Sequence, residues 1–267
     1  MARLLGRCAP RLLCLVLTLG CLGCSTARYG LAYDERLPAI RNVRLLPMKV
    51  DVYSIHAGGM REERTDLADA VRPRLLSELG NVVRERDRET IGERATTDKP
   101  DTSAKRDTSG ERDAPPRQSD AASNRRDQAS VRQTLVLAAV VEDAIVTHHY
   151  EHGDKPMFDY TLGDGVRAVA GEDTDAVLLV RLVAAVPTAG RVGVAIVSAA
   201  AGALSGSPRI VSTVSAEMSL MLVDGNSGDV LWYNRARGAY DVTSDGGLRR
   251  LVALATRDML KPWKTQN

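Results

Sequence analysis

Cysteine is absent from most of this 267-residue chain. The four cysteines are Cys8, Cys14, Cys21 and Cys24, and none follows. A chain exported to an oxidising compartment would therefore have no internal disulfide and no thiolate metal site beyond this N-terminal region. Aromatic residues are also scarce, at 4%, so the core must be built from Val, Leu and Ala.

The chain also has little net charge and few known signatures. The formal net charge is +2, and removal of an N-terminal signal that carries three arginines leaves −1. This gives no overall basis for binding nucleic acid or anionic lipid. There is no phosphate-binding loop, no G-x-G-x-x-G, and no correctly spaced G-x-S-x-G. We expect no nucleic-acid partner, no cofactor and no enzymatic activity.

The N-terminus has the layout of an export signal. Arg3, Arg7 and Arg11 precede the apolar run Leu12–Leu19, and small residues follow. The run is shorter than the ~20 residues that span a bilayer. A signal that ends in Gly-Cys indicates a lipoprotein, whose cysteine is acylated and becomes the first mature residue. We therefore expect residues 1–20 to be a lipoprotein signal peptide; an ordinary cleaved signal or an uncleaved anchor is the alternative.

Two cysteines, Cys21 and Cys24, are candidates for the acylated residue. Cys21 follows Thr18-Leu19-Gly20, whereas Cys24 has a cysteine three places before the cut, which is unusual. Gly23-Cys24-Ser25, however, has the usual form of such a junction. We favour Cys21 and keep Cys24 as the alternative. Neither is followed by Asp, so we expect a lipid anchor, of the palmitate type, on the periplasmic face of the outer membrane.

The remainder is expected to form one domain with an insert. Residues 21–38 are interpreted as a tether, 39–91 as the first part of an α/β domain, and 131–263 as its second part. Residues 92–130 contain no Val, Ile, Leu, Met, Phe, Trp or Tyr. Such a segment cannot offset ordering costs of ~1–2 kcal/mol per residue, so it is predicted to be a disordered charged linker.

In the first part, residues 40–55 alternate as one strand or as two short strands that meet at Pro47. Gly58-Gly59 ends this pattern. A helix is expected from Arg61, with Pro73 kinking or restarting it. Its apolar face comprises Leu67, Val71, Leu75 and Leu79.

In the second part, residues 131–146 favour a buried helix, with a strand as the alternative, and 163–171 a short helix. Residues 175–186 indicate a strand buried on both faces. The small-residue stretch 190–206 suits a helix or hairpin packed on the sheet, and its 13-residue apolar run is too short to span a membrane as a helix. Self-association through this stretch would give a homo-oligomer.

The C-terminal region predicts a β-hairpin followed by a helix. Alternation places Thr213, Ser215, Glu217 and Ser219 on the solvent face of a strand; its apolar face comprises Ile210, Val214, Ala216, Met218, Leu220 and Leu222. The loop 224–229 reverses the chain into a strand at 230–234. Ser244 or Asp245 can cap a helix that ends by Pro262. Its predicted buried residues are Leu248, Leu251, Val252, Ala255 and Met259. The fold class is therefore α/β, with a mixed sheet flanked by helices.

One motif suggests metal chemistry. His148-His149-Tyr150-Glu151-His152 fits H-x-x-E-H, the inverted zinc-protease signature. On a helix, His148 and His152 could share zinc, with Glu151 as general base and a distant acid such as Glu217 as third ligand. Gly153 and Pro156 follow closely and would end the helix. A polar loop that happens to contain histidines is the preferred interpretation, and a zinc hydrolase the alternative.

A second, weaker metal candidate is the loop 224–229. Asp224, Asn226 and Asp229 could bind Ca²⁺, but the loop lacks the later Glu of an EF-hand. Acidic residues and Asn are more often found in tight turns for backbone geometry.

Four segments resemble a known group of proteins: Val50–Gly59, Phe158–Gly163, Asp175–Arg181 and Leu222–Asn234. In this order they resemble a family of proteobacterial outer-membrane lipoproteins without established chemistry. More loosely, they are similar to the periplasmic α/β domain of the curli-secretion lipoprotein. The resemblance spans residues 40–90 and 131–260, and the charged insert and Pro73 depart from it. It implies a mixed sheet, a terminal hairpin and an envelope protein partner, but no activity.

Overall fold

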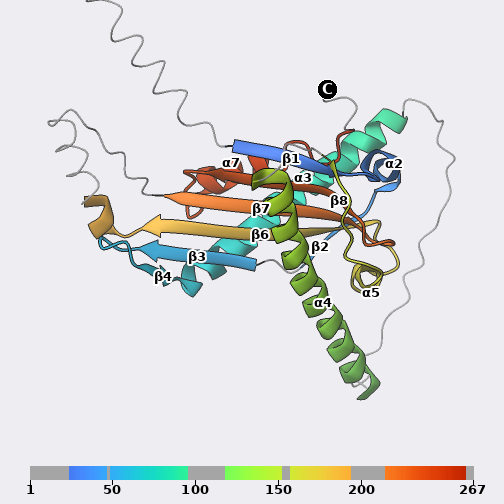
Figure 1. Cartoon of the computed structure of the whole chain (residues 1–267), viewed down its shortest axis with the longest axis horizontal. Coiled ribbons are helices and arrows are strands. Elements are labelled where there is room, and N and C mark those ends of the chain that lie inside the picture. The colour runs from blue at the N-terminus through green and yellow to red at the C-terminus, as the bar shows by residue number, and fades with distance from the viewer. Residues whose placement is uncertain (1–23, 47–48, 96–117, 152–156, 194–213, 263–267) are drawn as a thin grey trace, which may run out of the picture.

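The computed structural model describes five stretches of the chain (Figure 1): residues 24–46, 49–95, 118–151, 157–193 and 214–262. The predicted signal peptide, Cys21 and most of the small-residue stretch 190–206 lie outside them.

An eight-stranded mixed sheet forms the centre of the fold. The strand order is β4-β3-β6-β7-β8-β1-β5, and β2 also pairs with β6. The central strand β6 is parallel to β2 and β3 and antiparallel to β7, which confirms the predicted fold class. The strands are β1 Cys24–Gly30, β2 Val43–Leu45, β3 Lys49–Ile55, β4 Arg61–Glu63, β5 Met157–Phe158, β6 Ala176–Pro187, β7 Ser215–Asp224 and β8 Val230–Gly238.

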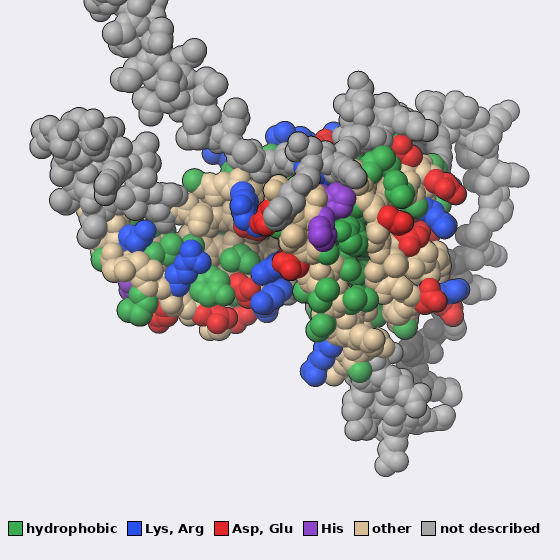
Figure 2. Space-filling view, in the orientation of Figure 1, with side chains coloured by type: hydrophobic (Ala, Val, Ile, Leu, Met, Phe, Trp, Pro, Cys, Tyr) green, Lys and Arg blue, Asp and Glu red, His purple; other side chains and the backbone are tan. Residues whose placement is uncertain are grey.

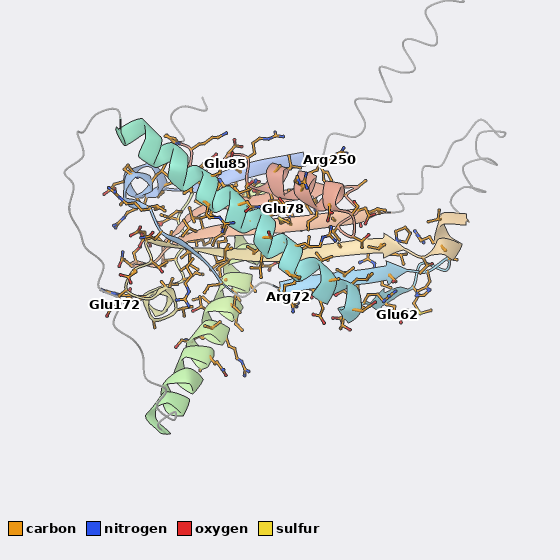
Figure 3. The ribbon with its side chains drawn as sticks, turned by 180° about the vertical axis from the view of Figure 1, so that it is seen from behind. Glu62, Arg72, Glu78, Glu85, Glu172 and Arg250 are labelled. Carbon is orange, nitrogen blue, oxygen red and sulfur yellow. The ribbon has the colours of Figure 1, made fainter. Side chains whose placement is uncertain are left out.

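Helices lie on both faces of this sheet. The helices α3 (Thr65–Ala95) and α7 (Asp245–Ala255) cover one face (Figure 3), and α4 (Gln118–Ile145) crosses the other (Figure 1). The other helical segments are α2 Tyr33–Arg36, the 3-10 turn Leu37–Ala39, the π-helix Val146–Glu151, α5 Gly165–Ala170 and a short helix over 189–193 at the end of a described stretch.

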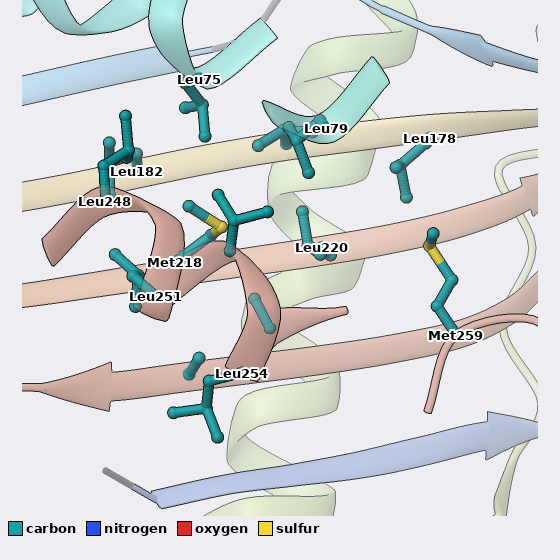
Figure 4. Packing of buried hydrophobic residues seen from close by; sticks show 14 of the residues in the cluster. Leu75, Leu79, Leu178, Leu182, Met218, Leu220, Leu248, Leu251, Leu254 and Met259 are labelled. Carbon is teal, nitrogen blue, oxygen red and sulfur yellow. The ribbon is translucent and has the colours of Figure 1, made fainter. Parts of the chain in front are cut away.

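Each face of the sheet has its own apolar cluster. Leucines and methionines of α3, α7 and the central strands interlock on the first face (Figure 4). On the second face, Ala138, Val141 and Ile145 of α4 pack on Leu179 and Met221 of the sheet. This arrangement explains why β6 is apolar on both faces, as the sequence predicts.

The segment predicted as a tether over 21–38 is instead part of the domain from Cys24 onward. Strand β1 pairs with β8, and α2 follows it. Tyr29 and Tyr33 are each 1% exposed and pack edge to face with ring centroids 5.1 Å apart. The Tyr33 hydroxyl also donates to the carbonyl of Lys261 at 2.9 Å. Two buried aromatic side chains fix this otherwise polar segment against the core.

The helix predicted from Arg61 begins later, because Arg61–Glu63 form β4 as the return strand of a hairpin with β3. Helix α3 then continues past Pro73 without restarting. Proline removes one backbone donor, but Pro73 is exposed, so solvent can satisfy the carbonyl that it leaves unpaired.

The predicted linker 92–130 is helical at both of its ends. Residues 92–95 end α3 and residues 118–130 begin α4; 96–117 lie outside the described residues. Ala, Gln and Arg in the N-terminal part of α4 are good helix formers, and they extend the packed segment that starts near Val131. The helix predicted over 131–146 is confirmed, but it is buried on one side only, since Val136 and Val140 are 67% and 61% exposed.

The C-terminal hairpin and its following helix are also confirmed. Ser244 is the N-cap of α7 and accepts a hydrogen bond from the Gly247 amide at 3.1 Å. The predicted solvent face of β7, however, is partly covered. Ser219 is buried because α4 lies over it, next to Met221.

Candidate functional site

Helix α4 and the sheet enclose a trough of about 450 Å³, a size common among small-molecule sites (~300–1,000 Å³). We name it the α4 trough. Leu135, Ala138, Ala139 and Glu142 of α4 line one side; the strands contribute Lys49, Leu179, Val180, Arg181, Ser219, Leu220, Met221 and Tyr233. Charged side chains gather on the sheet surface beside α4 (Figure 2).

A row of polar residues crosses four neighbouring strands at the edge of the trough. Lys49 lies opposite Arg181, Arg181 opposite Ser219, and Ser219 opposite Arg235. Directly opposed residues share one face of a sheet. We name these four residues the cationic row.

Glu142 links α4 to this row. Its Oε1 accepts hydrogen bonds from the Ser219 hydroxyl at 2.6 Å and the Tyr233 hydroxyl at 3.3 Å. Its Oε2 lies 3.6 Å from Arg181 Nη1, beyond hydrogen-bonding distance. Burial, and then the nearby Glu142 carboxylate, raises the pKa of Tyr233 far above its usual value. Tyr233 therefore remains a hydrogen-bond donor at any physiological pH.

A second group of charges adjoins the row. Glu217 accepts hydrogen bonds from Arg235 Nε at 2.5 Å and from Arg237 Nε at 2.7 Å. Burial opposes ionisation of Glu217, but the hydrogen bonds from the two arginines outweigh it and lower the pKa of this carboxyl. Arg181, Glu217 and Arg235 line a smaller pocket of about 270 Å³. These side chains are suited to holding a charged group in place.

Only part of the candidate zinc motif, residues 148–151, lies within the described residues. His148 and Glu151 lie in the π-helix Val146–Glu151, and His152 lies outside the described residues. The wider π turn changes the four-residue spacing on which the motif depends. Glu217, the suggested third ligand, is engaged by two arginines. In the described ranges, no three His, Cys, Asp or Glu side chains cluster closely enough for a metal ion.

The segment around His149 instead has a packing role. Arg28 of β1 donates from Nε and Nη2 to the His149 carbonyl, at 3.1 and 2.9 Å. The Arg28 guanidinium also lies 4.6 Å from the centre of the Tyr150 ring. The His149 ring packs edge to face against Phe158 and Tyr160. These contacts join the end of α4 to β1 and β5.

The loop 224–229, a weak calcium candidate, forms a backbone turn. Asp224 is 5% exposed, and its Oδ1 accepts from the amides of Asn226 and Ser227 at 2.8 and 2.9 Å. The Asp229 carboxylate accepts from the Ser227 hydroxyl at 2.7 Å. Gly228 has a φ of +77°, a conformation that glycine adopts readily. The carboxylates therefore stabilise the turn, as the preferred interpretation of this loop expected.

Cys24, the alternative anchor residue, is the first residue of β1 and lies opposite Arg237 of β8. Within the described stretches, no helix is both long enough and apolar enough to cross a membrane. No protein-family model, curated protein or solved structure matches the chain. The resemblance to outer-membrane lipoproteins therefore remains a prediction.

Sequence reasoning missed the trough and the cationic row. Glu142 interrupts the apolar run of α4, and Arg181 interrupts that of β6. A charge inside a segment that is otherwise buried is a signal for a polar site. That signal identifies single charged residues. Which of these residues lie close together depends on how α4 crosses the sheet.

Proposed function

We propose that the protein is a lipoprotein of the outer membrane that acts at its periplasmic face as a non-catalytic accessory or assembly factor of the cell envelope. The observation that carries this proposal is the N-terminal arrangement of three arginines, the apolar run Leu12–Leu19 and Gly20-Cys21. The α4 trough and the cationic row supply a surface on which such a protein can hold a partner.

The position of β1 supports Cys21 over Cys24 as the acylated residue. Lipid on Cys24 would emerge from the first residue of a strand that is paired with β8. Lipid on Cys21 leaves residues 21–23 as a spacer of roughly 10 Å when extended. In both cases the sheet would be held close to the leaflet, without the long tether that the sequence suggested.

Metabolic labelling with a clickable fatty acid tests the anchor. We expect label on the wild-type protein and on Cys24→Ser, and strong loss on Cys21→Ser. Cys14→Ser is a matched control, because Cys14 lies in the predicted signal and is removed with it. An unlabelled wild-type protein, or label that persists in the Cys21/Cys24 double variant, would contradict the proposal.

Site-specific photocrosslinking tests the partner. A photoreactive residue at Ala139, exposed beside the trough, should give a discrete protein adduct in cells. The same residue at Gly246, exposed at the start of α7 on the other face, is the control. Equal adducts at both positions, or none at Ala139, would count against a partner at this surface.

A metal assay separates the proposal from the zinc-hydrolase alternative. The protein purified with its membrane anchor should contain no stoichiometric zinc. Zinc that is present at one equivalent and lost on His148→Ala would favour the hydrolase.

A further inference from the structure

We propose that the α4 trough binds a single-chain amphiphile with an anionic head group, of the long-chain fatty-acid class. The inference rests on the trough alone, so it goes beyond the accessory role and does not require the anchor at Cys21. Two properties of the trough carry it: an apolar interior and a cationic edge.

The interior suits an alkyl chain. Leu135 and Ala138 of α4 face Leu179 and Met221 of the sheet across the trough. The small side chains of Ala138 and Ala139 leave space that a larger residue would fill. Removing a methylene group from water increases affinity roughly fourfold, so a chain that fills this space would be favoured over a short one.

The edge suits a carboxylate. Lys49 and Arg181 are direct neighbours on parallel strands, and both line the trough. Their side chains are 69% and 47% exposed, and like charges in facing positions repel. An anionic head between them would relieve this repulsion and accept hydrogen bonds from the guanidinium.

The existing counter-charges leave room for such a head. Lys49 lies 3.3 Å from Asp51, whereas Arg181 is 3.6 Å from Glu142 and makes no hydrogen bond to it. The cations around the cationic row are Lys49, Arg181, Arg235 and Arg237, and the carboxylates paired with them are Asp51, Glu142 and Glu217. Four cations against three carboxylates leave an excess of one positive charge. Glu142 is 16% exposed and lies among the trough residues, so it directs the head toward the solvent side of Arg181.

Photolabelling of the full-length protein in membranes tests the proposal. The probe is a sixteen-carbon fatty acid that carries a diazirine and an alkyne. We expect light-dependent adducts on peptides that contain Leu135 or Met221. Unlabelled palmitate should suppress them, and hexadecanol, which has the same chain without the charge, should require about ten times the concentration to do so. Lipid on Cys21 is attached without light, so this readout is separate from that of the anchor.

Variants identify the head-group contact. Arg181→Gln should reduce labelling about tenfold, as loss of a hydrogen bond to a charged group predicts. Arg72→Gln should leave it unchanged, because Arg72 has a similar exposure, 46%, on the opposite face of the molecule (Figure 3). Lys49→Gln, at a more exposed position, should reduce labelling several-fold. If Arg181→Gln lowers the melting temperature, the labelling of Lys49→Gln is the test of the head-group contact. Absent or scattered adducts, equal competition by hexadecanol, or undiminished labelling of Arg181→Gln and Lys49→Gln would overturn the proposal.

Discussion

Gly30→Ala should destabilise the whole domain, because β1 approaches β8 too closely at this position for a side chain. A Cβ atom on Gly30 would lie 2.1 Å from the Val230 carbonyl oxygen, well inside the 3.0 Å that real Cβ contacts respect. The obstacle is backbone, so it cannot rotate away. Strand β1 would have to move from β8, and Tyr29, which is 1% exposed, would lose its packing.

The expected cost of this change is about 2 kcal/mol. Overpacking a well-packed site typically costs ~1–3 kcal/mol, and a backbone obstacle places Gly30 at the upper end of this range; alanine returns ~0.4–1 kcal/mol by restricting the unfolded chain. For a protein of this size, this corresponds to a fall in melting temperature of roughly 4–8 °C. Thermal unfolding can be followed by tryptophan fluorescence, since Trp232 is fully buried.

Gly58→Ala is the matched control. A Cβ atom at Gly58 would meet nothing within 4 Å, and its φ is not positive. We expect its effect to stay within ~0.5 kcal/mol. If Gly30→Ala is equally silent, residues 24–30 are a tether after all, and the assignment of β1 to the sheet is wrong.

Three further changes probe the packing of β7, β8 and α7. Asn234→Ala removes a buried amide that donates to the Ala255 carbonyl at 2.6 Å; urea unfolding should show a loss of ~1–3 kcal/mol, and an unchanged midpoint would refute that bond. Ser244→Ala should cost ~1 kcal/mol and Ser244→Asp much less, so equal losses by the same assay would argue against the N-cap. The pKa of Glu217 is lower in the folded protein than in the unfolded chain. The ionised Glu217 therefore stabilises the folded protein above the unfolded pKa of ~4.3, and this contribution is lost as pH falls through the folded pKa. Glu217→Gln should flatten the decline of unfolding free energy below about pH 4; an identical decline in both proteins would exclude this group as its source.

The strands that could be predicted from sequence are those with strong local patterns. The buried run of β6 and the alternation and turn of the β7–β8 hairpin each specify a strand within about ten residues. Strand β1 could not be recognised in the same way, because its only large apolar side chain is Tyr29 and its partner strand is distant in sequence. Its stability comes from tertiary pairing, which a local pattern does not contain.

The candidate site was harder to predict than the fold. The zinc motif was visible because its residues are adjacent, but adjacency does not fix geometry, and the chain enters a π turn there. Lys49, Glu142 and Arg181 come from β3, α4 and β6, and they meet only because of the strand order and the path of α4. A site assembled from three separated segments becomes recognisable once the tertiary structure is known.

The pairing of β1 with β8 has a consequence for the order of folding. Tyr29 lies opposite Trp232, roughly 200 residues further along the chain. During synthesis at ~5–20 residues per second, roughly 10–40 s would pass between the synthesis of β1 and that of its partner strand β8. Contacts this distant in sequence slow folding, and a protease that removes the C-terminal hairpin from the finished protein would also release its N-terminal strand.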